Sequence, residues 1–110
     1  MKEILTSLIP ISVIDLYRLF RQDQFDKNYK DKWLANGRKW SPPYYIKHQT
    51  IKDFAKNFKI RTFIETGTFY GDMIYHCRST FDNLYTIELN SHYFQRAKKR
   101  FSSYSNIRVL

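Results

Sequence analysis

Hydrophobic residues recur at helical spacing near the start of the chain. The positions i, i+3, i+4 and i+7 are taken by Val13, Leu16, Tyr17 and Phe20. Ser12 and Asp15 form the S-x-x-D capping pattern, and Ile11 and Leu16 are placed as a hydrophobic staple. This pattern predicts a helix that begins near Ser12 and docks on its own domain through its apolar face.

A polar stretch, residues 22–32, separates this helix from the next one. Residues 33–43 contain an Asn-Gly pair and two prolines, which mark turns. A second helix is predicted to start after Ser41, with proline at its first position. Its predicted core face is Ile51, Phe54, Ala55 and Phe58. A solvated face carries Lys52, Lys56 and Lys59.

After Lys59 the spacing of hydrophobic residues changes, and the pattern predicts strands that alternate with helices. Strands are predicted over residues 60–64, 84–88 and 106–110, and a tight turn over residues 65–71. The helix after the turn has the apolar face Tyr70, Met73, Ile74, Cys77 and Phe81. The following helix, capped by Asn90 or Ser91, has the apolar face Tyr93, Phe94, Ala97 and Phe101. Two consecutive crossover units of this kind predict an α/β fold with a parallel sheet.

Composition limits the chain to one domain with a modest core, since it has 110 residues of which 43% are hydrophobic. A single cysteine excludes an internal disulfide, and the three histidines lie too far apart in sequence to suggest a zinc site, so no metal is predicted. The net charge of +9 is spread along the chain without a basic run, which favours a solvated basic surface over a nucleic-acid arm.

The apolar segment from Ile4 to Phe20 is not expected to cross a membrane. It has 17 residues and contains Pro10, Asp15 and Arg18, and a charge at the bilayer centre costs about 2.5 to 3.5 kcal/mol. No small-x-small cleavage site follows it, so a signal peptide is not expected either. We therefore predict a cytoplasmic protein.

Two features fall at the carboxyl ends of the predicted strands, where parallel sheets bind ligands. They are the turn from Gly67 to Gly71 and Glu88, which lies 21 residues after Gly67. A glycine turn and an acidic residue at this spacing suit the ribose of NAD, FAD or S-adenosylmethionine. Carboxylates at Glu65 and Asp72 would repel a pyrophosphate but attract a sulfonium and an ammonium group.

With these residues the chain resembles class I S-adenosylmethionine-dependent methyltransferases whose first motif reads F-I/V-E-T-G-T. The resemblance covers residues 41–110 well and residues 1–40 less specifically, which suggests an N-terminal helical extension and linker over 1–40. It implies a Rossmann-like fold with S-adenosylmethionine as cofactor. Carried over by residue, it implies that the methionine end is lined by Glu65, Thr66, Gly67 and Thr68. It also implies that Glu88 holds the ribose hydroxyls and that Gly71 lets the first helix approach the turn.

The resemblance ends in the third strand, so the chain corresponds to the amino-terminal half of such a domain. The half that would contact an acceptor substrate is missing, so no catalytic residue is assigned and the chain alone is expected to be inactive. His76 is a poor candidate for a catalytic base, and Cys77 is expected to be a buried hydrophobe. The acceptor substrate and the oligomeric state remain open.

Two other interpretations are kept. A basic, aromatic-rich nucleic-acid module would use Trp33, Trp40, Tyr44, Tyr45 and the lysines as a stacking and phosphate surface, although the same residues suit a docked amphipathic helix better. Residues 33–45 could form a lid over the acceptor site, but a linker packed across the sheet is the preferred interpretation.

Overall fold

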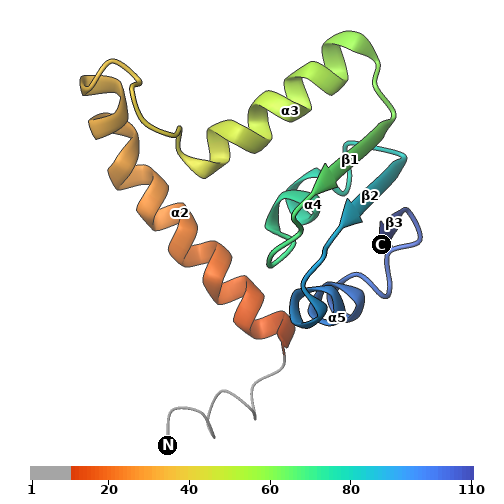
Figure 1. Cartoon of the computed structure of the whole chain (residues 1–110). Coiled ribbons are helices and arrows are strands. Elements are labelled where there is room, and N and C mark those ends of the chain that lie inside the picture. The colour runs from red at the N-terminus through yellow and green to blue at the C-terminus, as the bar shows by residue number, and fades with distance from the viewer. Residues whose placement is uncertain (1–10) are drawn as a thin grey trace, which may run out of the picture. The chain divides into compact units, whose positions relative to one another are not determined.

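The computed structural model describes residues 11–110, which form two compact units (Figure 1). The first unit comprises Met1–Tyr45 and the second Ile46–Leu110. The first part of the apolar segment 4–20 lies outside the described residues. No helix among residues 11–110 is long and apolar enough to span a membrane.

The described part of unit one contains α2, over Ile11–Ala35. The polar stretch 22–32, predicted to separate two helices, is therefore helical. No glycine or proline interrupts it, and pairs one turn apart support it: Lys27 Nζ lies 3.1 Å from Asp23 Oδ2, and Gln22 Nε2 donates to Asp26 Oδ1 over 2.9 Å. The described helix begins at Ile11, one residue before Ser12, in agreement with the predicted start.

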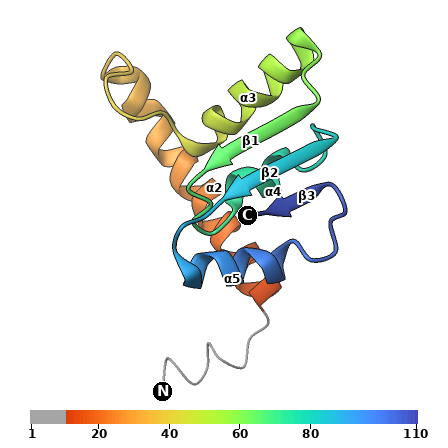
Figure 2. The same cartoon turned by 45° about the vertical axis from the view of Figure 1, so that its right-hand side comes forward.

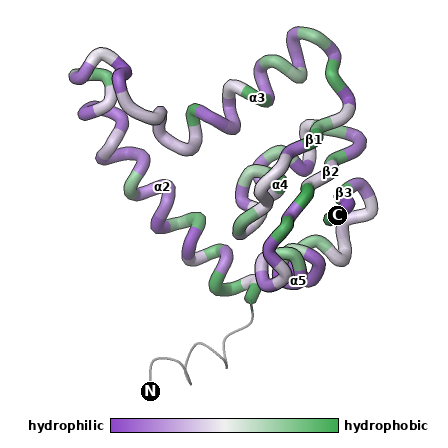
Figure 3. Tube along the Cα trace, viewed as in Figure 1, coloured by the Kyte–Doolittle hydropathy of each residue, from purple (hydrophilic) through white to green (hydrophobic). Residues whose placement is uncertain are grey.

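The predicted apolar face of α2 is exposed. Its four residues, Val13, Leu16, Tyr17 and Phe20, are between 51% and 61% accessible. The buried residues are instead Asp15, Asp26 and Trp33, whose spacing places them along one stripe of the helix. Figure 3 shows hydrophobic positions recurring between hydrophilic ones along α2. Within unit one these four side chains are therefore not buried, contrary to the predicted buried face.

The next helix, α3 (Tyr44–Phe58), begins two residues later than predicted. The carboxylate of Asp26 accepts the backbone N–H of Tyr44 at 3.2 Å and of Tyr45 at 2.9 Å. These are two of the donors that a helix start leaves without partners. The connecting turn is held by Trp33, whose indole N–H donates to the carbonyl of Trp40 over 2.8 Å.

Unit two is built on a three-stranded parallel sheet in the order β1-β2-β3 (Figure 2). Its strands and helices are β1 (Thr62–Thr66), α4 (Asp72–Cys77), β2 (Asn83–Ile87), α5 (Ser91–Arg100) and β3 (Ile107–Val109). The predicted α/β fold with a parallel sheet is confirmed. The first strand starts two residues later than predicted, and α4 stops at Cys77, although Phe81 still reaches the core.

One face of this sheet carries the core. The buried residues there come from α3, α4, α5, β2 and β3 and from the segments that follow α4 and α5. They are Ala55, Ile74, Cys77, Phe81, Leu84, Ala97, Phe101, Ile107 and Val109. Phe54 and Phe58, predicted for the core face of α3, are 57% and 68% exposed and stack on each other at 5.7 Å. That part of the prediction is wrong, because α3 packs on the core mainly through Ala55 and, in part, Ile51.

The opposite face of the sheet is exposed within unit two. Ile64, Tyr85 and Arg108 are register partners on this face, and Thr66 pairs with Ile87. Ile64 is 64% and Ile87 43% accessible. Helices normally cover both faces of a parallel sheet, so half of that arrangement is present in the described chain.

Candidate functional site

The turn after β1 has a tightly specified backbone. Gly67, Phe69 and Gly71 have positive φ angles of 80°, 51° and 83°. The Gly67 N–H donates to the carbonyl of Ile87 over 2.8 Å, and the Gly71 N–H donates to the carbonyl of Thr68 over 2.8 Å. Glycine adopts such angles without steric cost, whereas Phe69 is strained there. The turn therefore lies against the carboxyl end of β2, as expected from the strand order.

Glu88 connects the turn to the start of α5. Its Oε2 accepts the backbone N–H of Phe69 at 2.9 Å, and its Oε1 accepts that of Asn90 at 2.8 Å. These backbone hydrogen bonds, Asn90 first, lower the pKa of Glu88 and keep the carboxylate ionised. Asn90 caps α5 by accepting from the N–H groups of His92 and Tyr93. The structure thus brings together the turn and the acidic residue that the sequence singled out.

Glu65 lies at the same edge but in a different environment. Its Oε1 accepts a hydrogen bond from the Thr86 hydroxyl at 2.9 Å, and the Thr86 hydroxyl lies 2.5 Å from that of Thr68. Thr68 and Thr86 are buried. Burial raises the pKa of Glu65 to about 7, against the lowering effect of the Thr86 hydrogen bond. Glu65 therefore gains or loses its proton near neutral pH.

Asp72 does not offer the free carboxylate expected from the sequence. Its Oδ1 lies 2.7 Å from Nη1 of Arg100, and the two side chains are only 19% and 6% accessible. The same Arg100 nitrogen donates to the carbonyl of Tyr70 over 2.7 Å. This ion pair neutralises Asp72 and fastens the turn to α5, so the argument that Asp72 attracts a cationic ligand is wrong. Sequence spacing could not show an arginine 28 residues away as the partner.

The two outer glycines of the turn face different surroundings. A Cβ on Gly71 would lie 2.6 Å from Cε2 and 2.9 Å from Cζ of Phe101, whereas a Cβ on Gly67 would meet nothing within 4 Å. Gly71 therefore lets the turn approach α5. Gly67 leaves open space at the strand end, as a site approached by a ligand requires. Thr66, the last residue of β1, is exposed beside that space.

An aromatic cluster beside the turn was not predicted as part of the site. The ring centroid of Phe69 lies 4.3 Å from that of Tyr70 and 4.8 Å from that of Tyr93, and Arg96 stands 4.6 Å over Tyr70. Phe69 is 54% exposed. The sequence had assigned Tyr70 and Tyr93 to helix core faces, and only the fold brings these three rings together.

Other chemically active side chains lie elsewhere. Cys77 is fully buried, and desolvation raises the pKa of its thiol to about 11, which confirms the buried-hydrophobe prediction. His76 is half-buried and stacks on His48 at 4.0 Å, and its pKa is lowered by burial and then by Lys52. Residues 11–110 contain no group of three or more His, Cys, Asp or Glu side chains that could hold a metal. Trp33 is buried, so it cannot serve as the stacking surface of a nucleic-acid module.

Comparison with known proteins gives one structural match. No protein-family model and no curated protein matches the chain. A crystal structure of a putative caffeoyl-CoA O-methyltransferase from Staphylococcus aureus superposes with a TM-score of 0.54 and 21% sequence identity, over 90% of this chain and 48% of that chain. The chain thus spans about half the length of the protein it matches. It is therefore an α/β protein whose three-stranded parallel sheet matches part of a Rossmann-like methyltransferase fold.

Proposed function

We propose that the chain is the cofactor-binding part of an S-adenosylmethionine-dependent methyltransferase. The observation that carries this proposal is the position of the Glu88 carboxylate. It accepts the Phe69 N–H of the glycine turn and lies at the carboxyl end of β2. An ionised carboxylate beside a close backbone turn suits the two hydroxyl groups of a ribose. The methyltransferase match of the fold supports the same assignment.

The charge of the turn favours a cationic cofactor over a dinucleotide. Glu88 is held ionised, and Glu65 ionises near neutral pH. A pyrophosphate is normally held by a helix N-terminus, but α4 has only six residues, and Arg100 beside its first turn is already paired with Asp72. A sulfonium and an ammonium group would be attracted by Glu88 and by ionised Glu65. We therefore infer S-adenosylmethionine rather than NAD or FAD.

Different residues of the turn would contact different parts of the cofactor. Glu65, Thr66, Gly67 and Thr68 would line the methionine end, with Thr68 contributing its backbone because its hydroxyl faces Thr86. Glu88 would hold the ribose, and Gly71 would keep the turn against α5. The bound cofactor would supply an activated methyl group, and catalysis would rest on orienting an acceptor toward it. The acceptor and any catalytic base are left unassigned.

We further propose that residues 1–110 alone are inactive and bind the cofactor weakly. The chain matches 48% of the neighbouring structure, and β1 lies at one edge of the sheet with Ile64 exposed. The turn and Glu88 then form one wall of a cleft. Association costs at least about 4 kcal/mol in lost translational and rotational freedom. The contacts of a single wall exceed this cost by little, so binding is weak.

Nuclear magnetic resonance titration tests the cofactor directly, since it detects weak binding. S-adenosylmethionine at about 1 mM, a concentration suited to a weak complex, should shift the amide signals of Gly67, Phe69 and Glu88 in the 110-residue chain. NAD at the same concentration should not. Glu88→Ala should remove the shifts, whereas Asp53→Ala, which removes an exposed carboxylate of α3, should leave them unchanged.

The outcomes separate the two parts of the proposal. Equal shifts with NAD, or shifts that survive Glu88→Ala, would contradict the cofactor assignment. Micromolar binding by a monomer, or methyl transfer by this chain, would instead show that the site is complete without a second half.

A further inference from the structure

The outer edge of β3 has backbone groups directed away from the sheet. Among residues 11–110, β3 pairs only with β2. The Leu84 N–H donates to the carbonyl of Asn106, and the Leu110 N–H donates to that of Thr86, both over 2.8 Å. Because alternate residues of a parallel strand bond to opposite sides, Ile107 and Val109 direct their N–H and C=O groups outward. The Ile107 N–H donates to the carbonyl of Tyr104 over 3.3 Å. The groups that point outward from this edge are then the N–H and C=O of Val109 and the C=O of Ile107.

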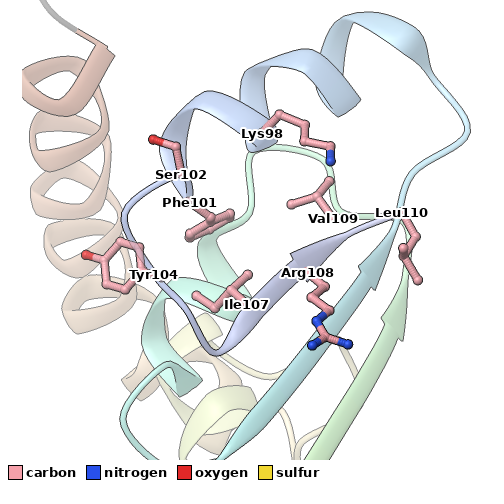
Figure 4. A pocket seen from close by; sticks show the side chains of 8 residues that line it. All are labelled: Lys98, Phe101, Ser102, Tyr104, Ile107, Arg108, Val109 and Leu110. Carbon is pink, nitrogen blue, oxygen red and sulfur yellow. The ribbon is translucent and has the colours of Figure 1, made fainter.

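A hollow of about 330 Å³ adjoins this edge (Figure 4). Its apolar lining includes Phe101, Tyr104, Ile107 and Val109. Figure 4 shows Ile107 and Val109 on the side of β3 that faces α5, and Arg108 on the opposite side. A strand added beside β3 would place alternate side chains on these same two faces.

The charged side chains around the hollow are all basic. Lys98 and Arg108 are among its eight lining residues, and none of the eight is Asp or Glu. A second copy of the chain would bring its own Lys98 and Arg108 to this edge. Charge complementarity therefore favours an acidic partner over self-association.

We propose that β3 and this hollow bind an extended segment of another protein with the pattern aliphatic-acidic-aliphatic. The segment adds as a strand beside β3 and bonds to the backbone of Val109. Its two aliphatic side chains lie over the hollow, and the acidic side chain between them meets Arg108 on the other face.

Fluorescence anisotropy with a labelled peptide tests this surface on the full chain. The probe is Ser-Val-Glu-Val-Glu-Val-Ser, and its control carries lysine in place of glutamate. We expect the glutamate peptide to bind at least about tenfold more tightly than the lysine peptide, as charge reversal at an interface produces. Arg108→Glu should weaken the glutamate peptide about fivefold or more, and the lysine peptide should recover affinity for that variant.

A matched variant separates a local site from general attraction to a basic protein. Lys47→Glu changes the net charge equally but lies on the exposed surface of α3, and it should change affinity less than about twofold. Hydrogen exchange should show protection of the Val109 amide when the peptide is bound. Equal losses of peptide affinity in the two variants, or no binding at all, would overturn the proposal. It would also be overturned if the peptide protected the Ile64 amide of β1 instead, or if the Val109 amide were protected by self-association.

Discussion

At Gly71 the turn and the ring of Phe101 leave no room for a side chain. Gly71→Ala places a Cβ 2.6 Å from Cε2 of this buried ring and also strains a backbone with φ +83°. We expect it to lower the free energy of unfolding by about 2 to 4 kcal/mol, the sum of overpacking and strain, measured by urea denaturation. Gly67→Ala is the matched control, because it has nearly the same φ but open space. It should cost about 1 kcal/mol, and equal losses would show that packing against Phe101 is unimportant.

Glu65 should make the protein less stable as the pH rises. Its pKa is about 7 in the folded chain and 4.5 without burial, so the folded state binds more protons between these values. The stability contributed by the neutral carboxyl is complete below about pH 4.5 and is lost as the pH rises through 7. Partial exposure reduces the effect to about 2 kcal/mol.

The check is urea denaturation from pH 5 to pH 8 of the parent chain and of Glu65→Gln. The glutamine should flatten this decline while keeping an acceptor for Thr86. Glu88→Gln should leave the profile in this pH range unchanged, because folding lowers the Glu88 pKa below 4.5 and its contribution is lost only at lower pH. An unchanged profile in Glu65→Gln would contradict the burial of Glu65.

At the scale of elements, one carboxylate determines where α3 begins. Asp26 lies on α2 and accepts the N–H groups of Tyr44 and Tyr45. Asp26→Ala should lower the free energy of unfolding by about 1 to 2 kcal/mol, the usual cost of losing a helix cap, and should speed hydrogen exchange of the Tyr44 and Tyr45 amides.

Asp23→Ala is the control for this experiment, because Asp23 is an exposed acid on the same helix that pairs with Lys27. Exposed pairs of this kind contribute about 0.3 to 0.5 kcal/mol. If exchange at Tyr44 and Tyr45 is equally fast in the parent and in Asp26→Ala, the cap does not stabilise α3.

At the scale of the whole molecule, the open edge of β1 and the exposed sheet face are expected to cause self-association. The Gly67 N–H bonds to β2, so the alternate residues of β1, Ile64 among them, direct their backbone groups outward. The Ile64 side chain is also exposed. Strand edges of this kind aggregate unless charges protect them.

Ile64→Lys should therefore raise the monomer fraction in analytical ultracentrifugation while leaving the circular dichroism spectrum unchanged. Lysine on an edge strand opposes strand addition and costs no buried contact at this position. Ser79→Lys adds the same charge at an exposed position after α4 and should have little effect. A parent chain that is already monomeric at high concentration would contradict this prediction.

The sequence by itself determined the order of elements in unit two. Hydrophobic residues repeat about every two positions in a strand and about every 3.6 positions in a helix. The alternation of strands and helices could therefore be predicted from local pattern, and with it the parallel sheet and the turn at its carboxyl end. The positions of Gly67 and Glu88 followed because parallel strands end at one edge. Residues 22–32 are helical although they are polar, because they contain no glycine or proline that would interrupt α2.

Only the tertiary structure decided which side chains are buried and which carboxylates carry charge. Phe54 and Phe58 have helical spacing but are exposed, while Ile51 and Ala55 of the same helix pack on the core. Asp72 and Glu65 are both acidic residues of the turn region. Arg100 forms an ion pair with Asp72, whereas burial raises the pKa of Glu65 to about 7. Burial and charge pairing depend on residues far apart in sequence, and the periodicity of one segment contains no information about such partners.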